Sequence, residues 1–437
     1  MTLEHPYEPR ETTEYGADQI IKVLHKSDVA LVNVGTGGGK TFMAIRAAAK
    51  RVPNANLIVL TTKKQVDSHH WEDSIDSYNE VMKTNLTYTV TNYEHLRVKK
   101  YFDEIVQNTL AIKDRFTIII LDECQRIKGY KPSQSFKAVL GLKQIPNAIK
   151  YIGLSATLAS NSILDAGNYL ILAGYYPNKT QFLNSHVTLW DDHYQPIVKD
   201  FNGDINPELI HNYDKLVSTI NYITVTISTE DKVPPRKGWQ KVFKYDKETQ
   251  KEYRDIIKAY KQGMFDSVQE AIMEERKFVA LHADQRNAYV KQLINDNNRP
   301  NTPILIFYQY NIERQVLFNY LKEELSDYEI KIIAGDSKKV DVSKPDNPKT
   351  IFLIQYRAGG EGLNAPWSRF TIFYSPTNSY QDFKQAQGRN RRAGSHETVY
   401  QVRLLVDKTV NYHMWTEVID KKKRFTKQLE SDLVDKE

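Results

Sequence analysis

Val34-Gly35-Thr36-Gly37-Gly38-Gly39-Lys40-Thr41 stands between two different hydrophobic patterns. The residues before it, 29–34, read as a β-strand, and residues 41–50 have helical spacing. In this context backbone N–H groups and a helix N-terminus converge on phosphate oxygens. We expect Lys40 to reach the β- and γ-phosphates of a nucleotide and the Thr41 hydroxyl to ligate Mg²⁺. The alternative is a glycine-rich turn with an incidental lysine, since Val34 stands where this pattern usually has Gly or Ala.

A second motif, Asp122-Glu123-Cys124-Gln125, follows the apolar run 118–121. Charged residues after a buried strand lie at the carboxyl edge of a sheet, where open α/β folds bind their ligands. We expect Asp122 to hold Mg²⁺ through water and Glu123 to position and deprotonate an attacking water, with Gln125 in the same catalytic set. Cys124 is expected to be a small buried spacer, because no histidine partner for a nucleophile stands nearby.

Short β-rich runs alternate with helical patterns along the whole chain, which is typical of parallel sheets in α/β domains. A proline pair, Pro234-Pro235, and a charged helical stretch over 246–295 separate two such series. The expected strands are 29–34, 57–60, 116–121, 151–154 and 222–227 in the first series, and 304–308, 330–333, 351–354, 370–374 and 399–405 in the second. The fold predicted from this order is two α/β halves joined by a short helical region.

Length and composition exclude several classes of protein. The 437 residues suffice for two or three domains, and 41% hydrophobic with 26% charged residues is near the globular average. No run of 18 apolar residues and no basic, apolar N-terminal leader is present, so we expect neither a membrane partner nor secretion. The single cysteine, Cys124, fits a reducing, cytoplasmic setting. A net charge of +6 permits a polyanionic partner.

Two further segments complete an ordered set of motifs, Leu154-Ser155-Ala156-Thr157 and Gln385-Ala386-Gln387-Gly388-Arg389-Asn390-Arg391-Arg392. With the glycine loop and the Asp-Glu pair, the set resembles that of the superfamily 2 helicases. Within them the chain looks most like the Swi/Snf-type DNA translocases. The narrower resemblance rests on Thr91-Asn92-Tyr93-Glu94, on 122–128 with 135–138, on 304–307 with Gln309, and above all on Ala358-Gly359-Gly360-Glu361-Gly362-Leu363-Asn364.

The resemblance implies two RecA-like P-loop domains, with parallel sheets covered by helices on both faces and with ATP and Mg²⁺ in the cleft between them. The expected parts are an ATP-binding domain at 1–228, a crossing and helical region at 229–300, and a second RecA-like domain with a C-terminal tail at 301–437. The second domain would supply Arg389 and Arg392 as arginine fingers, because charge on the γ-phosphoryl oxygens calls for prepositioned cations. It would also place Gly360 and Gln385 at the nucleotide.

A translocase holds the nucleic-acid backbone without reading its sequence, which requires hydroxyls, N–H groups and cations aimed at phosphates. The resemblance assigns this contact to Thr62, Lys63, Thr91, Asn92, Arg357 and Gly359. Each of these is also compatible with an ordinary polar loop. His69-His70 beside Trp71 is expected to form a helix start or a packing contact, since no third metal ligand is in sight.

The expected function is therefore that of an ATP-dependent motor moving along double-stranded DNA. Gln125 replaces the histidine usual in the Swi/Snf family, and Ser155-Ala156-Thr157 replaces its more common Thr-Gly-Thr. Both variants are compatible with an alternative function, that of a strand-separating helicase acting on single-stranded DNA or on RNA. A non-catalytic DNA clamp is the third hypothesis. The chain's small size suggests a bacterial or phage motor in the cytoplasm of the cell or infected host, with replication or recombination proteins as further partners.

Overall fold

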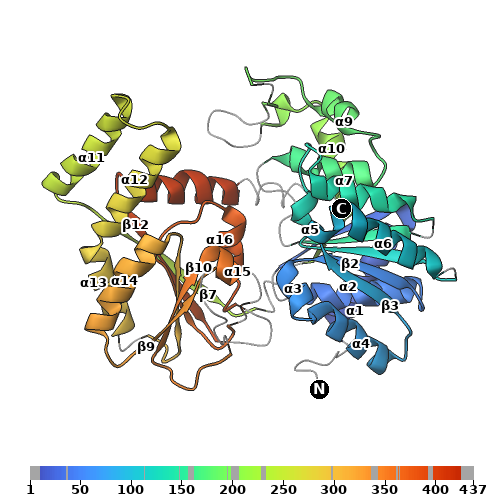
Figure 1. Cartoon of the computed structure of the whole chain (residues 1–437), viewed down its shortest axis with the longest axis horizontal. Coiled ribbons are helices and arrows are strands. Elements are labelled where there is room, and N and C mark those ends of the chain that lie inside the picture. The colour runs from blue at the N-terminus through green and yellow to red at the C-terminus, as the bar shows by residue number, and fades with distance from the viewer. Residues whose placement is uncertain are drawn as a thin grey trace. The chain divides into compact units, whose positions relative to one another are not determined.

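The computed structural model describes residues 10–35, 38–112, 114–146, 148–155, 162–193, 195–197, 206–227, 233–296, 299–335, 343–360, 363, 365–391 and 397–424. The chain forms two compact units, one extending to Thr229 and the other comprising Glu230–Lys423. Each unit is built on one sheet of six parallel strands, and in Figure 1 the first is coloured blue to green and the second yellow to red.

The first sheet has the strand order β3-β2-β4-β5-β1-β6. Its strands are β1 (Val29–Val34), β2 (Asn56–Thr61), β3 (Thr87–Asn92), β4 (Thr117–Asp122), β5 (Ala148–Ser155) and β6 (Thr224–Ile227). The strand that precedes the glycine loop, β1, is thus separated by β5 from β4, which ends in the Asp-Glu pair. Because every strand is parallel, the loops after β1, β2, β4 and β5 all emerge at one carboxyl edge.

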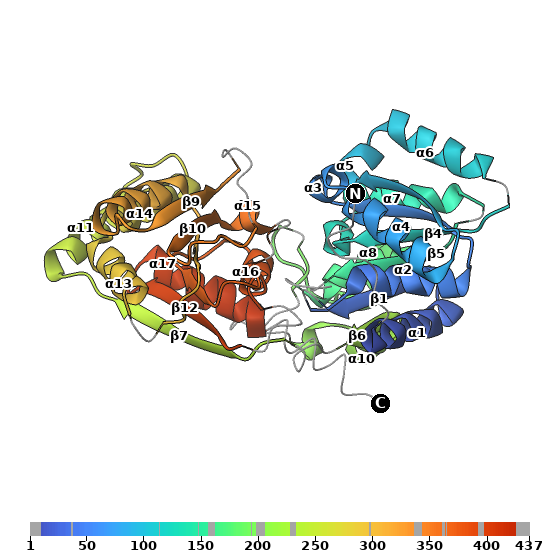
Figure 2. The same cartoon turned by 90° about the horizontal axis from the view of Figure 1, so that it is seen from below.

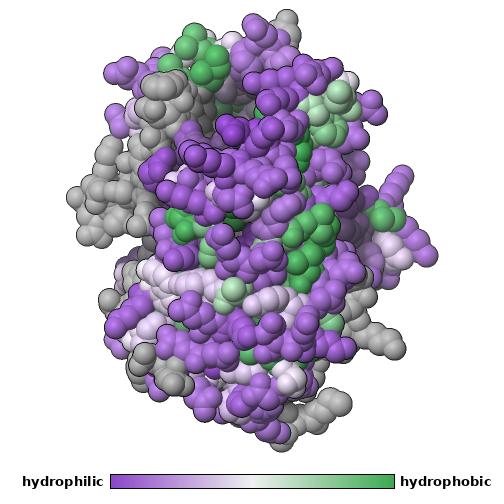
Figure 3. Space-filling view, turned by 90° about the vertical axis from the view of Figure 1, so that its left-hand side faces the viewer, coloured by the Kyte–Doolittle hydropathy of each residue, from purple (hydrophilic) through white to green (hydrophobic). Residues whose placement is uncertain are grey.

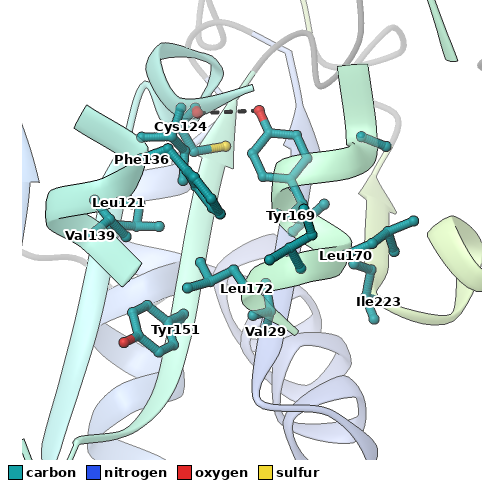
Figure 4. Close-up of a cluster of buried hydrophobic side chains, with 14 of the residues drawn as sticks. Val29, Leu121, Cys124, Phe136, Val139, Tyr151, Tyr169, Leu170, Leu172 and Ile223 are labelled. Atoms are coloured by element: carbon teal, nitrogen blue, oxygen red, sulfur yellow. Dashed lines mark hydrogen bonds between the residues drawn. The ribbon is translucent and has the colours of Figure 1, made fainter. Parts of the chain in front are cut away.

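Alternate side chains of these strands enter two separate cores, one on each face of the sheet. Ile119 and Leu121 of β4 belong to one core, whereas Ile118 and Ile120 belong to the other. A strand buried on both faces reads as a continuous apolar run, and this explains why β4 was visible in the sequence. Figure 4 shows part of the first core, in which Cys124 and Tyr169 lie beside residues of β1, β4 and β5.

Helices cover both faces of the first sheet (Figure 2). Those of the first unit are α1 (Glu11–Lys26), α2 (Lys40–Arg51), α3 (Lys63–Asp67), α4 (His70–Met82), α5 (Tyr93–Leu96), α6 (Lys99–Ala111), α7 (Gln134–Gly141), α8 (Gly167–Leu172), α9 (Lys179–His186) and α10 (Tyr213–Tyr222). Several begin at a side-chain cap, such as Thr62 for α3 and Asn92 for α5, whose oxygens accept a backbone N–H two to three residues on.

The second sheet has the order β7-β12-β11-β8-β10-β9. Its strands are β7 (Arg236–Phe243), β8 (Ile304–Tyr308), β9 (Glu329–Ile333), β10 (Thr350–Gln355), β11 (Phe370–Phe373) and β12 (Val399–Val406). The central strand β8 is buried along its whole length, whereas edge strand β7 is exposed at every position except Phe243. The second sheet therefore has a conventional core and one unusually exposed edge.

The helices of the second unit are α11 (Lys247–Lys261), α12 (Val268–Leu281), α13 (Asp284–Ile294), α14 (Asn311–Glu324), α15 (Tyr356–Gly360), α16 (Tyr380–Gln387) and α17 (Val410–His413), followed by a π-helical segment at Met414–Asp420. The side of the molecule seen in Figure 3 is mainly hydrophilic, with hydrophobic side chains in small separate patches. Among the described residues, no helix has the length and apolar character needed to cross a membrane.

These observations confirm the predicted fold class of two RecA-like domains with parallel sheets. All ten expected strands are present, and the helical stretch predicted over 246–295 forms α11, α12 and α13. Two strands were not predicted, β3 and β7. Both have few buried side chains, and so neither shows the apolar run from which the other strands were inferred.

Candidate active site

The described residues of the loop after β1 place a left-handed glycine and a lysine at the start of α2. Gly39 caps α2 in the left-handed conformation, with φ of 80°, which favours glycine because it has no Cβ. The ammonium of Lys40, the first residue of α2, donates to the carbonyl oxygens of Val34 at 2.8 Å and Gly35 at 3.2 Å. Gly38 and half-buried Thr41 flank this point, whereas Thr36 and Gly37 lie outside the described residues. The lysine is thus held across the loop where phosphate oxygens would bind.

Asp122 ends β4 at the same carboxyl edge of the sheet and is only 8% exposed. One carboxylate oxygen, Oδ2, accepts from the Thr61 hydroxyl at 2.8 Å and from the Trp71 indole N–H at 3.2 Å. The other, Oδ1, accepts the backbone N–H of Glu123 at 3.0 Å. Burial raises the pKa of Asp122, and the charge of Lys40 opposes that rise. Asp122 is thus a buried carboxylate held by three donors at the sheet edge that also carries the glycine loop.

A chain of hydrogen bonds joins the next residue to the end of β5. Glu123 has a φ of 50°, a left-handed backbone that turns the chain sharply after β4. Its Oε2 accepts the side-chain N–H of Gln125, whose Oε1 in turn accepts the Ser155 hydroxyl at 2.6 Å. Ser155 is buried and opens the Ser-Ala-Thr segment. The catalytic carboxylate predicted from the sequence is thus tied to that motif, although Ala156 and Thr157 lie outside the described residues.

Cys124 is a packed spacer, as predicted. Its side chain is fully buried and burial raises the pKa of its thiol, which disfavours the nucleophilic thiolate. Two tyrosines bind the backbone here: Tyr169 donates to the carbonyl of Cys124 at 3.2 Å (Figure 4), and Tyr93 donates to that of Asp122 at 2.8 Å. These bonds fix the backbone on both sides of Glu123.

The residues of the loop and of β4 fit a magnesium nucleotide. The loop offers phosphates a backbone turn, the N-terminus of α2 and one ammonium group. The Lys40 ammonium donates to backbone carbonyl oxygens here, and a phosphate oxygen can take their place as its acceptor. The Thr41 hydroxyl and the Asp122 carboxylate are oxygen ligands of the kind that Mg²⁺ prefers. The bound ion would neutralise charge on the phosphates, while Glu123 would orient and deprotonate water.

The predicted nucleic-acid contacts of the first unit fall into two groups. Thr62, Thr91 and Asn92 are buried, and the Asn92 side chain accepts the backbone N–H of His95 at 2.8 Å as the cap of α5. Lys63 is exposed at the start of α3 and free to contact solvent. Of these four residues, Lys63 has the side chain best placed for a phosphate, whereas the other three shape the loops.

In the second unit, the predicted residues lie at three places. Arg389 is 6% exposed and its guanidinium donates to the carbonyl of Leu363 at 3.0 Å, so that it ties the end of α16 to the loop after α15. Gln385 is half-buried on α16. Arg357 is exposed on α15, the helix that also contains Gly359 and Gly360. Arg392 lies outside the described residues.

Sequence reasoning missed three residues around Asp122. Thr61 and Trp71 bind its carboxylate directly, and Gln65 lies with its Oε1 at 2.5 Å from Thr61 Oγ1 and 3.2 Å from Trp71 Nε1. The position of Thr61 directly after the buried run 57–60 was an available signal, because it places the hydroxyl at the same sheet edge. For Trp71 the packing prediction was correct, since the ring is fully buried, but its hydrogen bond gave no sequence signal.

Two parallel RecA-like sheets, one with a phosphate loop and an Asp-Glu pair at its carboxyl edge, define a P-loop ATPase of the two-domain motor class. Residues 285–394 match the family described as helicase conserved C-terminal domain, and residues 6–160 match that of the type III restriction enzyme, res subunit. The chain belongs to the superfamily 2 helicases and is a nucleic-acid-dependent ATPase of that superfamily.

Among solved structures, the chain is similar to the SWI2/SNF2 ATPase core of Sulfolobus solfataricus in complex with double-stranded DNA. The two are 15% identical, the match covers 100% of each chain, and the TM-score is 0.38. Likeness at this level carries no argument about function. No curated protein matches the chain.

Proposed function

We propose that this motor is a translocase of the Swi/Snf type that hydrolyses Mg·ATP and moves along duplex DNA by contacts with its backbone. The class of enzyme follows from the two helicase-family matches, and the block Ala358 to Asn364 favours the duplex translocase within it. The observation that carries the proposed hydrolysis is the Lys40 ammonium held across the glycine loop, at the same sheet edge as the buried Asp122 and the neighbouring Glu123.

The bonded series Glu123–Gln125–Ser155 supports coupling between hydrolysis and nucleic acid. Glu123 orients water at the γ-phosphate, and its own orientation depends on Gln125 and through it on Ser155 at the end of β5. A shift of the Ser-Ala-Thr segment would therefore change the geometry of the base. Binding of nucleic acid would favour the arrangement in which the base and the cations of the second domain, Arg389 and Arg392, act on the same phosphate.

The experiment that tests the proposal is steady-state ATP hydrolysis by the full chain at one fixed salt concentration. The rate is measured without nucleic acid and then with duplex DNA, single-stranded DNA and single-stranded RNA. We expect the strongest stimulation with duplex DNA, together with displacement of a third strand from a triplex. Hydrolysis that no nucleic acid stimulates would contradict the proposal.

The second candidate is a helicase that separates strands. The hydrogen bond from Ser155 to Gln125 favours it, because both residues depart from the Swi/Snf pattern and interact with each other here. For this function the strongest stimulation would come from single strands, and a labelled fork would be unwound while a triplex would remain intact.

A further inference from the structure

Edge strand β7 has a composition that none of the motifs explains. From Arg236 to Phe243 it reads RKGWQKVF, with three cations and no acidic residue. Its side chains are exposed from 236 to 242, although an edge strand that only completes a sheet normally buries one face. The strand pairs with β12 over its full length and lies along one edge of the second sheet (Figure 2).

One face of β7 alternates cations with an aromatic ring. Lys237, Trp239 and Lys241 occupy every second position, so their side chains leave the strand on the same side. Helix α13 adds Tyr289 to this face: the Trp239 indole N–H lies 3.4 Å from its hydroxyl, and the Lys241 ammonium lies 5.3 Å from its ring centroid. We call these four residues the β7 strip.

Trp239 is held in place but not covered. Its ring packs edge-on against Phe370 at 6.1 Å between centroids, and the side chain is still 37% exposed. A tryptophan in a core would be covered, and one with no role on a surface would have no reason to be flanked by two lysines. Glu397, two residues before β12, forms an ion pair with Arg369 at 3.1 Å.

We propose that the β7 strip binds single-stranded nucleic acid, with a base stacked on Trp239 and phosphates on Lys237 and Lys241. Nonspecific single-strand sites combine an aromatic platform with cations that follow the backbone. The two lysines are about 13 Å apart along the strand, which places one on each side of a stacked base. An acidic peptide added to the edge of the sheet is the competing occupant, but strand addition would not require the tryptophan.

The inference rests on the proposed function for the source of the single strand, which a motor on DNA or RNA would generate or encounter. Its test does not depend on that function, because binding is measured without ATP. If hydrolysis proves insensitive to nucleic acid while the strip still binds oligonucleotides, the proposed function fails and the inference stands. In the reverse outcome, nucleic acid stimulates hydrolysis but the β7 strip does not bind oligonucleotides, and only the inference is then contradicted.

The experiment measures fluorescence anisotropy of a labelled oligothymidine with the full chain over a range of salt concentrations. In Lys237→Ala/Lys241→Ala, the slope of log affinity against log salt should become shallower by about 1.4, since each single-strand phosphate contact contributes about 0.7. Trp239→Ala should weaken binding about tenfold, and Trp239→Phe should retain most of the affinity because a ring remains.

The matched control is Lys322→Ala/Lys349→Ala, which removes the same charge from two exposed positions, one on α14 and one directly before β10. It should leave the salt slope unchanged. An equal change in slope in the control would overturn the proposal, as would unchanged binding in the strip variants. Poly-glutamate that competes as well as an unlabelled oligonucleotide, with Trp239→Ala binding normally, would assign the strip to an acidic peptide instead.

Discussion

Each of the two sheets carries a buried carboxylate at its carboxyl edge, and the two are bonded in similar ways. Asp122 follows β4 and accepts from a hydroxyl, an indole N–H and a backbone N–H. Glu313, on α14 after β8, accepts the backbone N–H groups of Gln309 and Tyr310 at 3.1 and 3.0 Å and the Ser375 hydroxyl at 2.7 Å. Burial raises the pKa of both.

The difference lies in what the bonds accomplish. All three donors to Glu313 come from the loops after β8 and β11, so the carboxylate closes the start of α14 in a capping box. The donors to Asp122 hold it at the edge of the sheet that also carries the glycine loop, and the charge of Lys40 opposes the rise in its pKa. A buried carboxylate with a raised pKa is therefore no sign of catalysis by itself, and the neighbouring glycine loop decides its role.

The largest effect is expected at the base beside Asp122. Glu123→Gln keeps the size of the side chain but removes its basicity, and it should lower nucleic-acid-stimulated ATP hydrolysis about 10²- to 10⁴-fold. The measurement is the steady-state rate with duplex DNA, accompanied by a thermal melt to show that the fold persists. Glu104→Gln, at an exposed position of α6, is the matched control and should hydrolyse ATP normally.

The corresponding change in the second unit should affect stability instead. Glu313→Ala removes a buried side chain and leaves the Tyr310 N–H and the Ser375 hydroxyl without their acceptor, and it should lower the free energy of unfolding by about 3 kcal/mol. Urea denaturation measures this, with the exposed Glu323→Ala on the same helix as the control. If Glu313→Ala were fully stable and yet inactive, the distinction between the two carboxylates would be lost.

A smaller effect is expected at Ser155. Ser155→Ala removes the donor to Gln125 without touching Glu123, and about a tenfold lower rate should follow, because the base loses one fixed support. The exposed Ser218→Ala on α10 provides the control. The fold stimulation by nucleic acid should fall together with the rate, and an unchanged rate would show that the series does not orient Glu123.

The smallest effect concerns pH. Because burial raises the pKa of Glu313, the folded state binds the proton more tightly than the unfolded state. The contribution of this group to stability is therefore complete below the unfolded pKa, about 4.3, and is lost as pH rises through the folded pKa. Relative to Glu313→Gln, wild-type protein should lose unfolding free energy over this window in urea titrations, whereas a difference independent of pH would contradict the assignment.

The sequence predicted the segments in which consecutive side chains are buried. Strands β1, β4 and β8 are mostly apolar because both of their faces are buried, and the motif residues stand at or directly after their ends. That Lys40 and Asp122 stand at the same edge of the sheet also followed from chain order, since the loops after parallel strands emerge at one edge.

Features that depend on contacts between distant segments were not predictable. Trp71 is 51 residues from Asp122 in the sequence, and nothing in its neighbourhood shows that its indole N–H will bind that carboxylate. Arg389 carries no signal that its guanidinium will bind the carbonyl of Leu363. Strand β7 is defined by its pairing with β12 and not by burial. Its sequence therefore has no apolar run from which the strand could be predicted.

The left-handed backbone of Glu123 has a consequence for how this chain would respond to selection for stability alone. A non-glycine residue with positive φ costs roughly 1 kcal/mol or more, and glycine adopts that conformation without strain. Glu123→Gly would relieve this strain while removing the carboxylate proposed as the base. Selection of random variants only for resistance to heat would therefore be expected to accept this substitution and to lose activity with it.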